Sequence, residues 1–514
     1  MPSEAAGTSC DVLVVGAGPT GLMLANWLLK LGVRAVVVDG KSGPTVESRA
    51  LVVQARTMEI YEQLGVVDEV LAAGWSAEAL SPGYEDRAFG RIPIGALGGG
   101  TTPYPRVQVL EQSRNEEILH ANLLKLGGEV LWEHELVALD EPPGGGVRAT
   151  LRGADGERVI AARFCVGADG SSSAVRRLRD IPFEGVTNPH TFYVIDATRT
   201  GGLVDRAVNV RLGRRDFLIA FPMGPRGDWR LIGLARHPDR PEGGGNPGGD
   251  EVSEDHARER LRDVFAVTYG PSRWYATYRV HHRVAAVFRD GPVFLAGDAA
   301  HVHSPVGAQG MNTGLQDAHN LAFKLADVVQ GRAGDHWLDR YEAERRPVAL
   351  RLVGSTDRLF GLITSQRLPF RLMVRLVAPL IGPLAVRTMP KASVAPRYFQ
   401  YISQTRIHYW MSPGAKYTAR GRRGAVVGRR LPWTGGNYAA LRSLRWQIHG
   451  YGGIVPGVAQ VLATGLGLPV YLFPAAPGTG LREGRLYLVR PDGFVAAEAA
   501  PADAPERFKR ALPG

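Results

Sequence analysis

Cysteine is nearly absent from this 514-residue sequence, which contains only Cys10 and Cys165. Each cysteine lies beside an apolar run typical of a buried strand, and neither has a partner at CxxC spacing. The sequence therefore gives no support for a disulfide framework, a cysteine zinc site or a thiol redox centre. We expect a protein of a reducing, cytoplasmic compartment.

Long apolar segments are also scarce. The first apolar run, Val12–Val15, is too short for the core of a signal peptide. A later apolar segment, 368–389, is interrupted by Arg371, Arg375, Pro379 and Pro383. We therefore expect no membrane span. Two interpretations of this segment stay open: a helix at a membrane interface, or a helix packed between domains.

Blocks of basic residues are missing as well, although the formal net charge is +11 and the isoelectric point is near 9.7. Positive side chains are spread along the chain and alternate with acidic ones. We expect no nucleic-acid partner, whereas a mildly basic surface favours an anionic cofactor or substrate. The composition is that of a globular protein, and the length predicts two or three domains.

What the sequence does contain begins with a strand, a glycine turn, a helix and a second strand over residues 11–40. Gly16, Gly18 and Gly21 have the spacing Gly-x-Gly-x-x-Gly, which lets backbone N–H groups and a helix N-terminus bind a pyrophosphate. Asp39 ends the second strand, where an acid accepts hydrogen bonds from an adenosine ribose. The pattern predicts a dinucleotide site rather than a purely structural turn, and alone it leaves FAD and NAD open.

The rest of the chain divides into further units. Periodicity predicts helices at 56–73, 114–126, 311–329 and within 341–389, and strands at 217–221, 230–235, 293–296, 446–449 and 486–489. We predict an α/β fold with a Rossmann-like nucleotide-binding domain, an inserted mixed β-sheet substrate domain, a helical linker and a small C-terminal domain. The predicted ranges are 1–181 and 284–395 for the nucleotide-binding domain with its helices, 182–283 for the sheet, and 425–514 for the C-terminal domain. The Gly- and Pro-rich residues 238–250 are predicted to form a surface loop.

Two acid–glycine pairs follow apolar strands later in the chain. Asp169-Gly170 follows 164–168, and Gly297-Asp298 follows 293–296. Each pair places a carboxylate at the C-terminal end of a strand, which is the edge where doubly wound sheets bind ligands. We expect each acid to lie at a ligand-binding edge of the sheet.

At these motifs the sequence resembles the class A flavin monooxygenases, the para-hydroxybenzoate hydroxylase family, over nearly its whole length. The matching stretches are 14–21, 168–170, and 297–301 continuing through Ser304-Pro305 to 310–314. The resemblance implies an FAD site in which Asp298 holds the ribitol chain and Asp169 lies near the pyrophosphate and the path of the reductant. It also implies that Arg49 and Gln112 touch the cofactor. The predicted cofactor contacts are Gly16, Gly18, Pro19, Thr20, Gly21, Asp39, Lys41, Arg49, Gln112, Asp169, Gly297, Asp298, Pro305, Gly310, Met311 and Asn312.

Two positions depart from the family pattern. Ala308 stands where the family more often has a second glycine, and it adds a methyl group near the isoalloxazine. Asp39 replaces the commoner glutamate, which shortens the reach to the ribose without changing its chemistry.

The resemblance also implies a reaction. NAD(P)H reduces FAD, dioxygen forms a C4a-hydroperoxyflavin, and the enzyme hydroxylates a bulky aromatic substrate, polycyclic and polyketide-like, as in antibiotic biosynthesis. A helix that begins near Gly310 would direct its positive end at the flavin pyrimidine edge and stabilise negative charge there. Baeyer–Villiger oxidation or epoxidation, and a non-catalytic flavin-binding partner protein, stay open as alternatives. A flavin halogenase is disfavoured because the WxWxIP segment associated with that class is missing.

The catalytic residues stay unassigned. Four polar residues in or beside the predicted substrate sheet are candidates for a base that deprotonates a phenol: His281, His282, Tyr193 and Tyr278. Each of these residue types is more often an ordinary surface or core residue. His301 and His303 have no third ligand in view, so we expect no metal.

The final unit, 425–514, resembles the thioredoxin-like C-terminal domain of the longer aromatic hydroxylases. It contains no cysteine, which excludes thiol chemistry there. We expect a role in packing, stability or association, including a possible homodimer.

Overall fold

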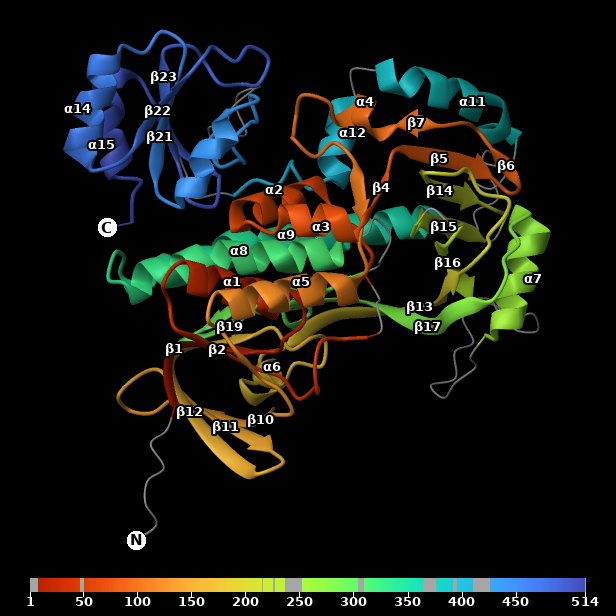
Figure 1. Ribbon diagram of the computed structural model, residues 1–514, viewed down its shortest axis with the longest axis horizontal. Coiled ribbons are helices and arrows are strands. Elements are labelled where there is room, and N and C mark those ends of the chain that lie inside the picture. Colours follow the sequence, from red (N-terminus) through yellow and green to blue (C-terminus); the bar gives the residue numbers. More distant parts are fainter. Residues whose placement is uncertain are drawn as a thin grey trace.

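The computed structural model describes residues 8–46, 50–214, 216–224, 227–235, 252–303, 309–363, 376–391, 395–409 and 426–513 (Figure 1). Arg49, Pro305 and Ala308 lie outside the described residues, and so does the predicted loop 238–250.

The chain opens with the predicted βαβ unit, which is confirmed. β1 (Thr8–Val15) leads through Gly16 into α1 (Pro19–Lys30), and β2 (Ala35–Val38) returns parallel to β1. Gly16 has φ of 104°, and a Cβ there would overlap the carbonyl oxygen of Ala168. Glycine is therefore required at this turn.

The first sheet has the strand order β10-β11-β12-β1-β2-β9, and β19 pairs with β12 and with β18. The new strands are β9 (Val130–Leu131), β10 (Glu135–Asp140), β11 (Val147–Gly153), β12 (Gly156–Gly167), β18 (Arg289–Asp290) and β19 (Val293–Leu295). β2, β1, β12 and β19 run parallel, and Val38, Val15, Gly167 and Leu295 are paired in one row at their C-terminal ends. This register brings the three predicted motifs to one edge of the sheet.

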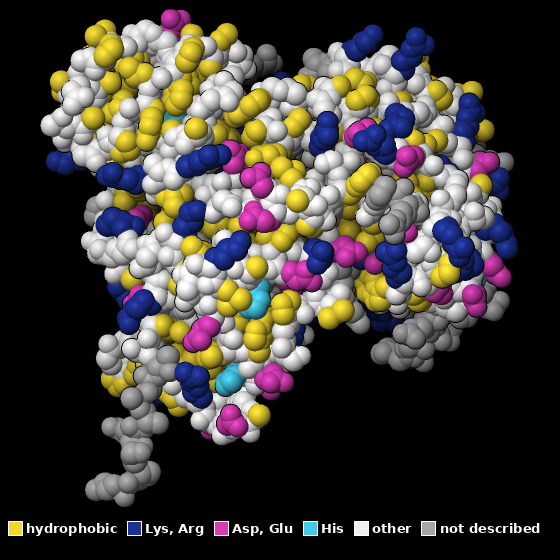
Figure 2. All heavy atoms as spheres, viewed as in Figure 1, with side chains coloured by type: hydrophobic (Ala, Val, Ile, Leu, Met, Phe, Trp, Pro, Cys, Tyr) yellow, Lys and Arg dark blue, Asp and Glu magenta, His cyan; other side chains and the backbone are white. Residues whose placement is uncertain are grey.

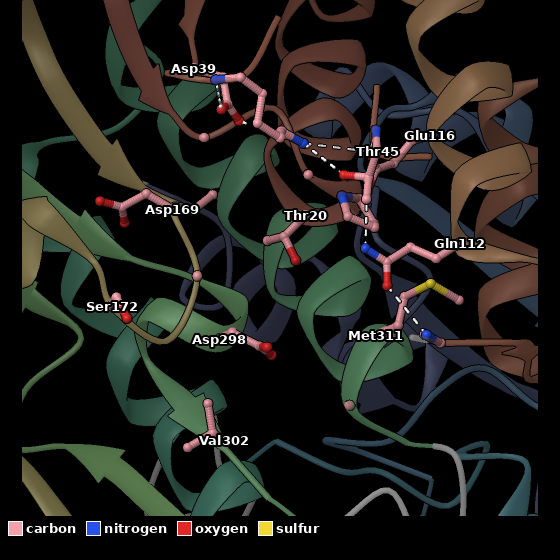
Figure 3. Close-up of a pocket in the computed structure, with 18 of the residues that line it drawn as sticks. Thr20, Asp39, Thr45, Gln112, Glu116, Asp169, Ser172, Asp298, Val302 and Met311 are labelled. Carbon is pink, nitrogen blue, oxygen red and sulfur yellow. Dashed lines mark hydrogen bonds and ion pairs between the residues drawn. The ribbon is translucent and has the colours of Figure 1, made fainter. Parts of the chain in front are cut away.

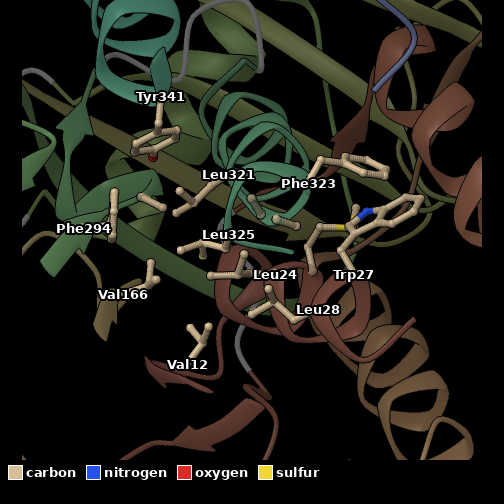
Figure 4. Close-up of a cluster of buried hydrophobic side chains, with 14 of the residues drawn as sticks. Val12, Leu24, Trp27, Leu28, Val166, Phe294, Leu321, Phe323, Leu325 and Tyr341 are labelled. Carbon is tan, nitrogen blue, oxygen red and sulfur yellow. The ribbon is translucent and has the colours of Figure 1, made fainter. Parts of the chain in front are cut away.

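Helices cover the first sheet and bury its apolar side chains. They are α1, α5 (Gln112–Lys125), α6 (Ala174–Leu178), α8 (Gly310–Val329) and α9 (Asp339–Ile363). α1 packs against α8, where Leu24, Trp27, Leu321 and Phe323 belong to one buried core (Figure 4). The predicted helix over 56–73 is wrong in one respect, because α2 (Ala55–Leu64) and α3 (Val67–Ala73) are separated at Gly65, which has φ of 95°.

The second sheet has the order β20-β17-β13-β16-β15-β14-β5-β6, with β7 paired to β5. Its strands are β5 (Ala79–Tyr84), β6 (Arg87–Ala88), β7 (Ile92–Pro93), β13 (Phe183–Ala197), β14 (Ala207–Leu212), β15 (Phe217–Pro222), β16 (Trp229–Ala235), β17 (Ser272–Ala285) and β20 (His301–Val302). The range 182–283 therefore contains only part of this sheet, because strands from 79–93 extend it. α7 (Glu254–Phe265) covers one face, where Tyr193 and Leu231 pack (Figure 1).

Smaller elements complete the region around the second sheet. They are β3 (Val52–Val53), β4 (Trp75–Ala77), β8 (Val107–Val109), α4 (Ile94–Gly98), α11 (Ala378–Thr388) and α12 (Ala395–Ile402). β3, β8 and β4 form a short sheet, and α4, α11 and α12 lie together beside β7 and β5 (Figure 1). Among the described residues, no helix has both the length and the apolar character needed to cross a bilayer.

The C-terminal unit forms a separate sheet with the order β22-β21-β23-β24. Its elements are β21 (Gln447–Tyr451), α14 (Pro456–Leu466), β22 (Val470–Phe473), β23 (Arg485–Val489), β24 (Val495–Ala499) and α15 (Ala504–Lys509). Buried ion pairs join it to the rest of the molecule: Arg430 Nη1 lies 2.7 Å from Glu59 Oε1, and Arg490 Nη1 lies 2.6 Å from Glu344 Oε1. Buried charges without these partners would be costly, so the unit is docked in one defined orientation.

Charged side chains are mixed on the surface. Figure 2 shows Lys and Arg side chains interspersed with Asp and Glu on the face in view. This distribution agrees with the alternation of signs along the sequence.

Candidate active site

A cavity of about 880 Å³ opens at the C-terminal edge of the first sheet and extends to the second sheet (Figure 3). Its walls come from the turns after β1, β2, β12 and β19, from the N-terminal ends of α5 and α8, and from β15, β16 and β17. Strand ends and helix N-termini converge there because the four parallel strands end in one row.

Most of the predicted cofactor contacts line this cavity. They are Gly16, Gly18, Pro19, Thr20, Asp39, Lys41, Gln112, Asp169, Asp298, Gly310 and Met311. These residues come from distant parts of the chain, and the fold brings them together at one site.

Three of the predicted contacts that the structure describes do not line the cavity. A Cβ at Gly21 would overlap the carbonyl oxygen of Gly16, and a Cβ at Gly297 would lie 2.5 Å from Thr20 Oγ1. These two glycines therefore allow close packing of the turns. The side chain of Asn312 donates to the Val52 carbonyl and accepts from the Gln54 backbone N–H, each at 2.8 Å. Asn312 thus fixes β3 and the start of α2 against α8.

The Asp39 carboxylate is held by backbone donors. Its Oδ2 accepts from the N–H of Ala17 at 2.6 Å, and its Oδ1 accepts from the N–H of Lys41 at 2.9 Å. The Lys41 ammonium lies 3.8 Å from Asp39 Oδ2 and donates to Thr45 Oγ1 at 2.9 Å. One wall of the cavity therefore carries a fixed carboxylate beside a cation.

Glu116 and Thr45 complete this wall, and sequence reasoning missed both. Glu116 is fully buried, and it accepts from Thr45 N at 2.8 Å and from Gln112 Nε2 at 2.9 Å (Figure 3). Glu116 lies four residues after Gln112 on α5, so helical spacing was the available signal. Its carboxylate ties the segment after Lys41 to α5.

Asp169 forms the opposite wall. Its Oδ2 accepts from the N–H groups of Ala174 at 2.7 Å and Val175 at 3.2 Å, at the start of α6. Its Oδ1 is buried and has no hydrogen-bond partner among the residues that the structure describes. Burial raises the pKa of Asp169 despite these backbone donors. A buried oxygen without a partner at the cavity wall fits a ligand that supplies one.

The turn after β19 places Asp298 at the cavity in η1 (Gly297–Ala299). Arg176 connects this turn to the turn after β12, because it donates to the Ala299 carbonyl at 2.8 Å and to the Ser171 carbonyl at 2.7 Å. The two acid–glycine motifs are therefore held against each other by one buried guanidinium.

The far end of the cavity is apolar and belongs to the second sheet. Phe221, Ile232 and Tyr278 line it from β15, β16 and β17. Ile232 and Leu231 point to opposite faces, as neighbours in a strand must, and Leu231 packs in the core under α7. The sheet thus offers one apolar face to the cavity.

The four candidate bases occupy different places. Tyr278 lines the cavity, whereas Tyr193 is buried in the core under α7. His282 is buried, and His281 Nδ1 is hydrogen-bonded to Thr187 Oγ1 at 3.0 Å; neither lines the cavity. His303, considered above only as a metal ligand, does line the cavity.

Within the described residues no group of three or more His, Cys, Asp and Glu side chains is arranged to hold a metal. His301 Nε2 instead lies 2.6 Å from Asp317 Oδ2, and both side chains are buried. Cys10 and Cys165 are free and buried.

The residues at this cavity fit FAD. A Cβ at Gly18 would meet no atom within 4 Å, so the glycine turn faces open space in which a pyrophosphate fits. Asp169 Oδ1 has no hydrogen-bond partner in the described part of the chain, and the volume of about 880 Å³ spans both a cofactor region and an apolar wall. The fold and site together define a flavin-type dinucleotide-binding protein.

Comparison with known proteins agrees. The FAD binding domain family model matches residues 9–356. The sequence is 34% identical to 6-methylpretetramide 4-monooxygenase of Streptomyces rimosus, over 97% of this chain and 92% of that protein. Among solved structures, OxyS anhydrotetracycline hydroxylase from Streptomyces rimosus has a TM-score of 0.73 at 28% identity, covering 98% of each chain. CabE, an aromatic hydroxylase from angucycline biosynthesis, has a TM-score of 0.75 at 28% identity, covering 98% of this chain and 99% of that one.

The chain therefore belongs to the FAD-binding monooxygenase family. The resemblance seen at the three motifs, the FAD cofactor and the monooxygenase class are confirmed. The roles of individual residues stay predictions.

Proposed function

We propose that this protein is an FAD-dependent, NAD(P)H-consuming monooxygenase that hydroxylates a bulky, polycyclic, polyketide-like phenol. The observation that carries the proposal is the single cavity that joins the glycine turn at Gly16 to the apolar face at Ile232. Such a cavity holds a dinucleotide at one end and a large apolar ring system at the other. The tetracycline- and angucycline-pathway relatives support this substrate class.

We assign each part of FAD to residues of the cavity wall. Gly16, Gly18 and the N-terminus of α1 hold the pyrophosphate, and Asp39 accepts from the ribose hydroxyls. Asp298 would hold the ribitol chain, and the start of α8 at Gly310 would bind the flavin ring. Arg49 and Pro305, outside the described residues, complete the predicted set. When bound, FAD supplies the activation of dioxygen and accepts hydride from NADPH or NADH.

The protein itself orients the substrate, excludes water from the substrate region and stabilises charge on the flavin. α8 begins at Gly310, and the positive end of its helix dipole would stabilise negative charge at the pyrimidine edge. Phe221 and Ile232 exclude water from the substrate region. Tyr278 is the cavity-lining member of the four predicted bases, and we infer that it interacts with the phenol.

We also propose the finer organisation predicted from the sequence. The C-terminal unit, 425–514, has a thioredoxin-like fold whose role is packing or association, and the chain forms a homodimer in the cytoplasm. The nucleotide-binding domain comprises 1–181 and 284–395. The range 182–283 is inserted between them and supplies the central strands of the substrate sheet, to which β5, β6, β7 and β20 from the flanking ranges also belong. The four-stranded C-terminal sheet with two helices supports the first of these points.

The first test is reconstitution with FAD, followed by anaerobic addition of NADPH or NADH with and without polycyclic phenols. We expect a yellow protein whose flavin bleaches faster with a phenol that fits, and a product that gains one oxygen atom on the ring. A ring-expanded ester as the product would instead indicate Baeyer–Villiger oxidation, and an epoxide would indicate epoxidation. A protein that cannot bind FAD, or one whose NAD(P)H consumption never responds to substrate, would overturn the proposal.

Two adjacent variants sharpen this test. Ile232→Trp fills the apolar end of the cavity, so the phenol should lose its effect on flavin reduction while FAD stays bound. Leu231→Met changes the neighbouring residue on the opposite face, and volume-conserving swaps of this kind are well tolerated. We expect the Leu231→Met protein to respond to the phenol as the wild type does.

A further inference from the structure

The turn that carries Asp298 is closed by one buried carboxylate outside the cavity. Asp317, on α8, accepts from the backbone N–H of Gly297 at 3.2 Å and from His301 Nε2 at 2.6 Å through the same oxygen. Gly297 and His301 are the two ends of this turn, and Asp298 lies between them. Asp317 itself does not line the cavity, so it acts on the turn and not directly on a ligand.

Arg345 holds Asp317 from the other side. Its Nε donates to Asp317 Oδ1 at 2.6 Å, and its Nη2 donates to the Thr313 carbonyl in the first turn of α8 at 3.1 Å. Both side chains of the ion pair are 0% exposed. Burial opposes ionisation, but Arg345 and His301 hold the pKa of Asp317 below its ordinary value. The carboxylate therefore stays charged as it holds the turn.

The same arginine reaches the C-terminal unit. Arg345 Nη1 donates to the hydroxyl of Tyr409 at 3.0 Å, and the Tyr409 ring stacks on Phe494 with centroids 4.1 Å apart. The Tyr409 N–H also donates to the Gly428 carbonyl. Buried contacts thus run without a gap from the C-terminal unit to the turn at the cavity. A buried ion pair contributes little net stability relative to apolar residues of the same size, but it fixes the geometry of the groups that it joins.

We propose that Asp317 and Arg345 are positioning residues that couple the docked C-terminal unit to the turn carrying Asp298, and so set how firmly FAD is held. This inference rests on the proposed role of Asp298 toward the ribitol chain. The C-terminal unit would then affect FAD binding although it does not line the cavity.

The test measures FAD affinity by flavin fluorescence and the environment of the bound flavin by visible circular dichroism. Asp317→Asn keeps the shape but replaces one acceptor oxygen by an N–H donor that faces Arg345 or His301. We expect FAD to bind at least about tenfold more weakly, as loss of charged hydrogen bonds implies. The circular dichroism bands of the flavin that remains bound should also change.

A matched control lies on the same helix. Asp327 is buried near the far end of α8, and its Oδ1 accepts from Arg332 Nε at 2.8 Å, the same pair of atoms as in the Arg345–Asp317 contact. Asp327→Asn removes an arginine-paired carboxylate from the same helix without touching the turn. We expect its FAD affinity and flavin spectrum to match those of the wild type.

A milder variant covers the case in which Asp317→Asn fails to fold. Tyr409→Phe removes only the hydroxyl that accepts from Arg345, and we expect it to weaken FAD binding about threefold, with Arg345 less firmly held. If wild-type protein binds FAD but Asp317→Asn or Tyr409→Phe binds it as tightly as Asp327→Asn does, the coupling is overturned and the proposed function stands. If wild-type protein does not bind FAD, the proposed function fails and the inference fails with it.

Discussion

The Asp39 carboxylate accepts a hydrogen bond from the backbone N–H of Ala17 at 2.6 Å, across 22 residues of sequence. The contact exists because Val15 and Val38 are paired at the ends of β1 and β2, so the residues that follow them meet. The acid is thus already oriented by the glycine turn that it faces. A preorganised acceptor contributes more to binding than a mobile one.

Replacing Asp39 with alanine should weaken FAD binding about 10- to 100-fold, because hydrogen bonds to a charged group contribute about 1.5–3 kcal/mol. Titration of the apoprotein with FAD, followed by flavin fluorescence, measures the change. Asp11→Asn is the control, since Asp11 is paired with the exposed Arg34 at 3.0 Å, away from the cavity. Equal affinities in the two variants would contradict the ribose contact assigned to Asp39.

Replacing Asn312 with alanine should destabilise the fold more than it weakens FAD binding. The change leaves the Gln54 N–H and the Thr57 hydroxyl without the oxygen that accepts from each at 2.8 Å. Each unsatisfied buried group costs about 1–3 kcal/mol, so the free energy of unfolding should fall by about 3 kcal/mol. Urea unfolding of the apoprotein measures this loss. Weaker FAD binding with unchanged stability would instead favour the direct cofactor contact predicted from the sequence.

Replacing Gly314 with alanine should also lower stability. A Cβ there would overlap Thr20 Oγ1 and lie 3.1 Å from the Cα of Gly297. Overpacking costs about 1–3 kcal/mol, which exceeds the gain of about 1 kcal/mol from replacing glycine within a helix. The same substitution in a Thr20→Ala background should cost less, and thermal unfolding of the four apoproteins gives the coupling energy. Additive effects would show that the two residues do not compete for this space.

Acid should destabilise the protein through His449. Burial lowers the pKa of His449 to about 3. Its ring nitrogens are hydrogen-bonded to Gln447 and Tyr451 in the C-terminal unit. In the unfolded chain the pKa is about 6.5, so below that pH the unfolded state binds a proton that the folded state refuses. This contribution to stability is complete above pH 6.5 and is lost as the pH falls toward 3, by up to about 1.4 kcal/mol per pH unit. In His449→Gln the free energy of unfolding should fall less steeply between pH 6 and 4, and an unchanged slope would exclude His449 as a source.

Much of the cofactor region could be predicted from the sequence because its signals are local. Gly16, Gly18 and Asp39 have fixed spacings within one βαβ unit, and the acids at 169 and 298 lie two and three residues after apolar strands. Spacing of this kind depends on backbone geometry that a short segment determines by itself. The predicted gathering of these residues at one edge is confirmed by the pairing of the strand ends.

Other site features depend on contacts between distant segments. Glu116 reaches Thr45 across 71 residues, and Asn312 reaches Gln54 across 258, so no window of sequence contains either pair. The strands of 79–93 join the substrate sheet because β5 pairs with β14. No local sequence pattern predicts this pairing. Tyr193 and Tyr278 appear equivalent in the sequence, yet the strand pleat and register place one in the core under α7 and the other at the cavity.

The sequence by itself determined the nucleotide-binding unit, the order of its three motifs and the scarcity of cysteine that leaves thiol chemistry unsupported. Tertiary structure alone decided that cofactor turns and an apolar sheet face share one cavity, and that a C-terminal unit reaches the Asp298 turn through Tyr409, Arg345 and Asp317. The physical reason is the range of the interactions. Backbone preferences and side-chain periodicity act over a few residues, whereas packing and buried ion pairs join segments whose separation along the chain carries no information about their distance in space.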